Sequence, residues 1–291
     1  MAMKYILPIA FVALVSAQQQ PPATEVFLAP MPVKAGEALK WVNISNSPGY
    51  DNQPAFLPDS SAILFSSNRD GSQTDIYRYD IATKKLTQVT NTPELEYSPM
   101  VTPDRRTFSA VRVEADKSQR LWRFDLDGSN PRVILENVKP VGYHAWIDET
   151  HLALFILGSG GGAPATLQLA DTKTGAATVA VTGIGRSLLI RPKTGTVSYM
   201  ATGETPKMVK ELDPKTGTSN ALIAPLEGGQ DAAWTPDGRL IMSNGSTFSQ
   251  WRPGATTWEP LAMFDGTDVK NVTRLVVSTD GQWLAFVAEL R

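Results

Sequence analysis

The sequence predicts an all-β fold: a six-bladed β-propeller of four-stranded antiparallel blades. A unit of apolar strand, turn and second strand occurs six times, and its turns fall at positions 59, 104, 149, 193, 237 and 280. These turns are 45, 45, 44, 44 and 43 residues apart. Four strand-like segments in such a period are typical of propeller blades. Helical 3.6-residue patterning is absent, which favours strands throughout.

The first 17 residues resemble a secretory signal peptide. Lys4 precedes an apolar run from Tyr5 to Val15, and the small residues up to Ala17 suit a cleavage site. The run is too short for a transmembrane helix, although an uncleaved anchor remains the alternative. We therefore expect a signal peptide over 1–17, a Gln/Pro-rich tether over 18–23 and a propeller over 24–291.

The two ends of the chain are expected to share one blade. Strand candidates at Glu25–Leu28 and Leu39–Ile44 precede the first unit, whereas the last unit, from Arg274 through Trp283–Val287, supplies only half a blade. If the N-terminal strands pair with the C-terminal strands, the ring closes and leaves no open blade edge.

The blades follow one another with recognisable turns. Asp70-Gly71 marks a turn in blade one (53–92), and Asp127-Gly128 marks one in blade two (98–138). Blade three (143–183) contains the run Gly158–Gly162, read as a hairpin tip or recognition loop. Blade four (187–228) turns at Arg191–Lys193, and blade five covers 231–268.

Two apolar columns run through the first strands of the units. We expect both columns to pack between neighbouring blades. The first holds Ala55, Met100, Ala145, Leu189, Ala233 and Val276, and the second holds Phe56, Val101, Trp146, Ile190, Trp234 and Val277.

Blade one resembles a known repeat. Phe56–Asp59, Ser67–Gly71, Asp75–Asp80 and Leu86–Thr92 are similar to the TolB-type repeat, a Pro-Asp relative of the WD40 repeat. The resemblance implies a TolB-like propeller and a periplasmic setting. TolB itself carries an additional N-terminal α/β domain, for which the short tether leaves no room. Similar propellers gate serine peptidases, but this sequence has no Gly-x-Ser-x-Gly elbow.

Composition narrows the function classes. The chain has 27 basic and 29 acidic residues, a net charge of −2, and no basic stripe that would bind nucleic acid. It contains no cysteine, which excludes disulfides, thiolate catalysis and cysteine-zinc sites.

The residues just before each first strand should surround one mouth of the central channel. A cationic side and an aromatic side would suit a carboxylate-bearing peptide or an acidic sugar. The alternative is an Arg-Asp-Arg network that pins neighbouring blades together. The candidate ligand-binding residues are Asn52, Gln53, Tyr97, Tyr143, His144, Arg186, Asp231 and Arg274.

No metal site or cofactor is expected. The only histidines are His144 and His151, and further ligands cannot be placed beside them. Asp125–Asn130 resembles the start of a calcium loop but lacks its terminal glutamate, so a hairpin turn explains it better.

Function is less readable than fold, because propellers carry many activities. We expect an exported, periplasmic or secreted, monomeric propeller that binds a protein or peptide of the envelope or exterior without catalysis. Two alternatives remain. One is a channel-sited hydrolase, lyase or lactonase, for which Asp231 and His144 are the best candidates; the other is a purely structural envelope protein.

Overall fold

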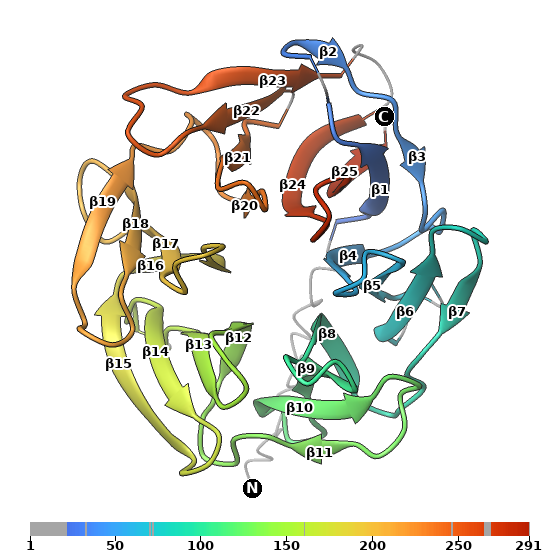
Figure 1. Cartoon of the computed structure of the whole chain (residues 1–291). Coiled ribbons are helices and arrows are strands. Elements are labelled where there is room, and N and C mark those ends of the chain that lie inside the picture. Colours follow the sequence, from blue (N-terminus) through green and yellow to red (C-terminus); the bar gives the residue numbers. More distant parts are fainter. Residues whose placement is uncertain are drawn as a thin grey trace, which may run out of the picture.

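The computed structural model describes residues 22–290 except positions 33, 70, 72, 160, 246 and 265–268. The predicted signal peptide, tether residues 18–21, Asp70 and Gly160 therefore lie outside the described residues. All regular elements in the described part are strands, and they form the predicted ring of six antiparallel blades (Figure 1). No described segment forms a helix with the length and apolar character needed to cross a membrane.

Blades one to three each contain four strands, ordered from the channel outward in chain order. Blade one contains β4 (Asp51–Phe56), β5 (Ala62–Ser67), β6 (Asp75–Asp80) and β7 (Leu86–Gln88). Blade two contains β8 (Leu95–Val101), β9 (Thr107–Val113), β10 (Gln119–Asp125) and β11 (Arg132–Val133). Blade three contains β12 (Val141–Trp146), β13 (His151–Ile156), β14 (Thr166–Asp171) and β15 (Ala176–Thr182).

Blades four to six complete the ring. Blade four contains β16 (Ile184–Ile190), β17 (Val197–Ala201), β18 (Met208–Leu212) and β19 (Ser219–Ile223). Blade five contains β20 (Ala232–Trp234), β21 (Leu240–Ser243), β22 (Thr247–Trp251), β23 (Glu259–Met263) and an added strand, β2 (Glu37–Ala38). Blade six contains β24 (Val269–Val277), β25 (Trp283–Leu290), β1 (Glu25–Pro30) and β3 (Val42–Asn43).

Ring closure occurs as predicted. β1 pairs antiparallel with β25 over its full length, from Glu25 opposite Ala288 to Pro30 opposite Trp283. The terminal strands thus share blade six, and no half-blade is left with an open edge.

The second N-terminal strand differs from its prediction. Only Val42–Asn43 of the expected 39–44 is a strand, and the preceding β2 pairs parallel with β23 of blade five. The amide of Leu39 donates to the Met263 carbonyl at 2.9 Å, and its side chain is buried between blades five and six. The chain therefore covers the edge of blade five before it reaches blade six.

The predicted columns pack between blades, with one difference. Trp146 and Trp234 are buried, and each indole N–H donates to a serine of the preceding blade, Ser109 at 2.9 Å and Ser198 at 2.8 Å. In the first column Ala145 and Ala233 are buried. Around the axis these strands have no further strand beside them, so four first-column members also line the central cavity: Ala55, Met100, Leu189 and Val276.

The Asp127-Gly128 hairpin is also present. The Gly128 amide donates to the Asp125 carbonyl at 2.9 Å, and Gly128 has a φ of 85°. Asp125 and Asp127 accept hydrogen bonds from Asn130 and Ser129 within this turn. A hairpin, rather than a calcium loop, therefore accounts for 125–130.

Candidate functional site

The innermost strands are interrupted near one mouth of the channel. Register shifts occur in β4 between Asn52 and Ala55, in β8 between Tyr97 and Met100, and in β24 next to Thr273. Within these bulges Gln53, Ser98 and Arg274 have φ values of 57°, 53° and 48°. Left-handed backbone is unfavourable for such residues and recurs where a bulge redirects a side chain.

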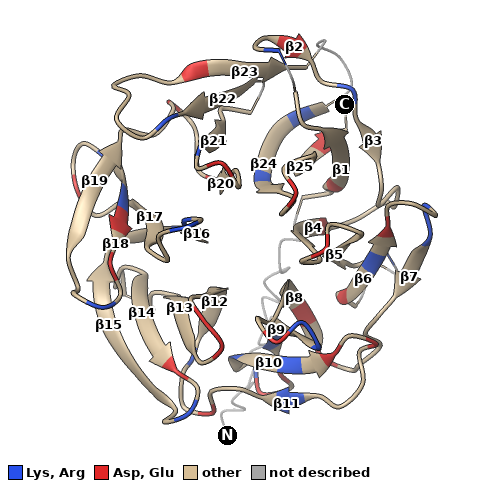
Figure 2. Ribbon diagram, viewed as in Figure 1, with Lys and Arg blue, Asp and Glu red and all other residues tan. Residues whose placement is uncertain are grey.

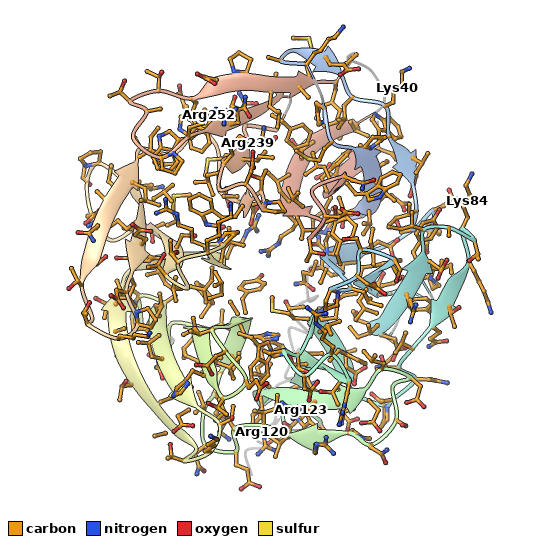
Figure 3. The ribbon with its side chains drawn as sticks, in the orientation of Figure 1. Lys40, Lys84, Arg120, Arg123, Arg239 and Arg252 are labelled. Carbon is orange, nitrogen blue, oxygen red and sulfur yellow. The ribbon has the colours of Figure 1, made fainter. Side chains whose placement is uncertain are left out.

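All six innermost strands line a central cavity of about 160 Å³ at this mouth. Its lining includes six of the eight predicted residues: Gln53, Tyr143, His144, Arg186, Asp231 and Arg274. Figure 2 shows basic residues on the inner strands β16 and β24, whereas Lys40, Lys84 and Arg120 lie on the outer side of the ring (Figure 3). The sequence repeat therefore brings residues from distant positions to one place.

Two arginines share one buried carboxylate in this cavity. Arg186 donates from Nε and Nη2 to the two Asp231 oxygens at 3.1 and 2.6 Å, and Arg274 Nη1 donates to Oδ1 at 3.3 Å. The Asp231 side chain is 7% exposed, and those of Arg186 and Arg274 are 33% and 14% exposed. Burial alone would raise the pKa of Asp231, but the adjacent Arg274 and Arg186 charges lower it below its usual value.

The arginines also contact the aromatic side of the mouth. Arg274 donates from Nη2 to the Tyr143 hydroxyl, and its guanidinium lies 4.4 Å from the centre of the Tyr143 ring. This contact joins blade six to blade three across the channel. The cluster is therefore a network, as the structural alternative requires, yet with two cations and one anion it keeps an excess positive charge.

Tyr50, which is not among the predicted residues, also belongs to this cluster. Its ring packs edge-on against Tyr97 at 6.2 Å between centroids, and its hydroxyl interacts electrostatically with Arg274, Tyr143 and Arg186. Burial raises the pKa of Tyr50, so the hydroxyl stays protonated. Tyr50 precedes β4 in the closure segment, outside the repeated columns. The one feature of the sequence that could have placed Tyr50 at the mouth is its position three residues before Gln53.

Asn52 and Gln53 connect the blades. The buried Asn52 amide donates to the Thr24 hydroxyl at 3.3 Å. The side-chain Oε1 of Gln53 accepts from the Ser66 hydroxyl at 2.9 Å and from the Ser98 backbone amide at 3.0 Å, joining blades one and two. Tyr97 accepts from the Thr74 hydroxyl at 3.3 Å. These contacts fix the wall of the mouth on which Tyr50 and Tyr97 stand.

His144 lies in the wall of the cavity, 4% exposed. Its Nε2 is 2.7 Å from the Ser109 hydroxyl, and burial lowers its pKa to about 3. His144 is therefore neutral at every physiological pH.

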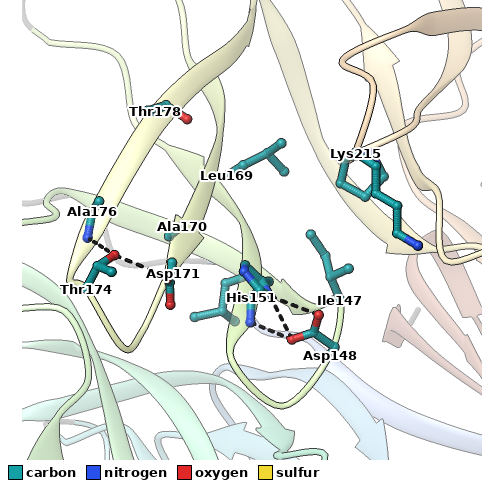
Figure 4. Close-up of a pocket in the computed structure, with 12 residues that line it drawn as sticks. Ile147, Asp148, His151, Leu169, Ala170, Asp171, Thr174, Ala176, Thr178 and Lys215 are labelled. Atoms are coloured by element: carbon teal, nitrogen blue, oxygen red, sulfur yellow. Dashed lines mark hydrogen bonds and ion pairs between the residues drawn. The ribbon is translucent and has the colours of Figure 1, made fainter.

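The other histidine is remote from the mouth. His151 Nδ1 lies 2.9 Å from an Asp148 oxygen, in a pocket between blades three and four (Figure 4). Within the described residues, no three His, Cys, Asp or Glu side chains are grouped to hold a metal.

Comparisons with known proteins agree with this architecture. No protein-family model matches the chain. A TolB candidate from Agrobacterium tumefaciens has a similar structure, with a TM-score of 0.72, 14% identity and coverage of 91% of this chain and 98% of its own. A gluconolactonase from Xanthomonas campestris gives a TM-score of 0.65 at 10% identity, covering 94% and 99%.

A third similar structure is an oligogalacturonate lyase in complex with manganese. Its TM-score is 0.58 at 14% identity, with coverage of 91% of both chains. At such identities the likenesses concern the fold alone. The chain is a TolB-like six-bladed propeller, and its similarity to the lactonase and the lyase concerns overall structure only.

Proposed function

We propose that this protein is an exported propeller that recognises a ligand at the mouth of the channel where Arg186 and Arg274 lie. The ligand is a carboxylate-bearing peptide of an envelope or secreted protein. The observation that carries the proposal is one carboxylate shared by two arginines in a cavity of the central channel. A ligand carboxylate would balance the remaining charge and gain charge-assisted hydrogen bonds. Tyr50, Tyr97 and Tyr143 offer apolar faces with polar tips beside it.

Recognition is favoured over channel catalysis by the state of the two best catalytic candidates. Asp231 is held by two guanidinium groups, and His144 is buried with its Nε2 facing Ser109. Neither is poised as an acid or base near neutral pH, since the pKa of each is lowered. The alternative, an enzyme with its site in the channel, is supported only by the structural similarity to the lyase and the lactonase.

Calorimetry with an acidic peptide and its amidated form tests the proposal. The acidic peptide should bind more weakly as salt rises, because exposed charges are screened over about 10 Å at 0.1 M. Arg186→Ala should abolish this binding. Arg191→Ala is the matched control, since Arg191 pairs with Glu211 at 2.7 Å in the same blade but does not line the mouth.

Equal loss of binding in both variants, or equal binding of acidic and amidated peptides, would contradict a carboxylate site. If no acidic peptide or uronic acid shifts the melting temperature of the wild-type protein, the cluster is a clamp between blades and the proposal fails.

A further inference from the structure

The outer edge of blade three differs from the other blade edges. β15 runs for seven residues, Ala-Ala-Thr-Val-Ala-Val-Thr, and includes no charged side chain. Val179 is 56% exposed at its centre. Proteins usually protect long edge strands with charges, proline or covering segments, because unpaired backbone groups accept another strand.

The remaining edges are short or covered. Figure 1 shows the outermost strands around the ring. β3 and β11 have two residues, β7 three and β19 five. The five-residue β23 is covered by β2. Among the described blades, β15 is therefore the longest outer edge without a neighbour.

The molecule already uses strand addition at such an edge. Residues 37–38 lie parallel to β23, with Glu37 opposite Ala262 and Ala38 opposite Met263. An extended segment from another part of the chain has thus joined a blade from outside. The same geometry is open to a segment from a different polypeptide at β15.

A pocket of about 430 Å³ adjoins this edge. Ala176 and Thr178 of β15 line it together with Leu169 of β14, and Ile147 and Pro214 contribute apolar surface from the turns of blades three and four. In Figure 4 Lys215 lies across the pocket from Ala176 and Thr178, and His151 and Asp148 lie between these two sides. An added strand would place alternate side chains on the pocket side of the blade.

We propose that β15 is a docking edge for an extended segment of another polypeptide, which adds a fifth strand to blade three and inserts one large apolar side chain into this pocket. The backbone bonds supply affinity and the pocket selects the side chain.

A second copy of this chain fits the pocket less well. Antiparallel self-pairing centred on Val179 would set Thr182 opposite Ala176 and Ala180 opposite Thr178. These small side chains would leave a volume of about 430 Å³ largely unfilled. Because close packing stabilises such contacts, a bulky aliphatic or aromatic residue suits the pocket better.

The charged residues that line the pocket specify the docking segment further. Two carboxylates, Asp148 and Asp171, line the pocket against one lysine, Lys215, and neither carboxylate forms an ion pair with a lysine or arginine among the described residues. A basic residue beside the apolar anchor would complement this side. The partner chemistry is therefore an extended segment with a large apolar residue next to a lysine or arginine.

A displayed library of random nine-residue peptides, selected on the whole mature protein, tests the proposal. Enriched sequences should carry the apolar anchor and a basic neighbour. Their binding should weaken about tenfold or more, or about 1.4 kcal/mol, with Val179→Lys, a substitution that protects edges in natural sheets. Val42→Lys is the matched control, because Val42 is 55% exposed on another outer strand.

Two further readouts separate strand addition from simple contact. Alternate N-methylation of an enriched peptide should abolish binding, since it removes the backbone donors, and Thr178→Trp should block the pocket. Arg186→Ala should leave this binding unchanged, which keeps the result independent of the channel mouth.

Failure to enrich any peptide, equal effects of Val179→Lys and Val42→Lys, or full binding by the N-methylated peptide would each overturn the proposal. A dimer that forms without peptide and is lost with Val179→Lys would replace it with self-association.

Discussion

Asp231 explains why a polar cluster can persist beside an apolar core. Its carboxylate is buried, and two guanidinium groups from neighbouring blades supply the hydrogen bonds that water would otherwise make. Such a pair stabilises little when it is measured against an apolar replacement, but removing one member leaves an uncompensated charge. The cluster therefore joins blades four, five and six while it shapes the mouth.

Replacing Asp231 with asparagine tests this role. Asp231→Asn leaves Arg186 and Arg274 as like charges in a partly buried site, so the free energy of unfolding should fall by more than the ~1 kcal/mol typical of exposed pairs. Denaturant unfolding measures the change. Glu204→Gln is the control, because Glu204 pairs with Lys210 at 2.6 Å but is 39% exposed. Equal, small losses in both variants would mean that the cluster stabilises the fold no more than an exposed ion pair does.

The residues of the mouth were predictable where the repeat places them. Asp231 and Arg274 occupy the same position in successive units, and Arg186 occupies the position just before it in the preceding unit, so column alignment alone predicted that they lie close together. Tyr50 was not predictable in this way, because it lies between β3 and β4, outside the aligned columns. His144 contacts Ser109 of the neighbouring blade, which also accepts a hydrogen bond from Trp146, and a strand pattern does not reveal this arrangement.

A second repeated feature is a buried carboxylic acid near the start of an innermost strand. Asp51 begins β4 and Glu96 lies in β8, 45 residues later, each at a junction with the preceding blade. At these junctions Asp51 faces Glu25, and Glu96 faces Asp75. Burial raises the pKa of Asp51 to about 6 and that of Glu96 to about 7.

These carboxyl groups make stability depend on pH. Between the ordinary pKa of a glutamate and about 7, the folded state binds a proton at Glu96 that the unfolded state has released. Stability from this group is therefore lost as pH rises through that range. Between pH 4.5 and 8, the free energy of unfolding of Glu96→Gln should therefore rise relative to that of the wild type by on the order of 2–3 kcal/mol.

Urea unfolding of both proteins across this range provides the measurement. Comparing the two cancels the opposite contribution of Asp231, whose pKa is lowered. Glu259→Gln, on the exposed face of β23, should show no such pH-dependent difference. A constant difference between Glu96→Gln and wild type would mean that Arg112, which donates to Glu96 at 3.0 Å, keeps the carboxylate ionised throughout.

At the scale of the whole ring, the period of the sequence determined most of the fold. Six turns spaced 43 to 45 residues apart indicated six blades, and the unmatched half-units at the two ends indicated closure. The excursion of residues 37–38 to blade five was not predictable, because a two-residue parallel strand has no alternation to detect. The chain reaches that edge through Gly36, whose φ of 75° permits the turn.

Closure should decide whether the propeller folds at all. Deleting 24–45 removes β1, β2 and β3, and with them Val26, Phe27 and Leu28, which are buried between blades five, six and one. Each of these side chains contributes about 1.5–3 kcal/mol by burial, so their sum approaches a typical total stability of about 5–15 kcal/mol. The deletion would also expose the edge of β25, which pairs with β1 over six residues.

We expect the shortened protein to aggregate or to lose cooperative unfolding, as measured by size-exclusion chromatography and thermal melting. Deleting only 18–23 should change neither property, because these residues precede the first strand. A soluble chain without 24–45 that still melts cooperatively would show that five blades and a half-blade are sufficient, and that the terminal strands do not hold the ring together.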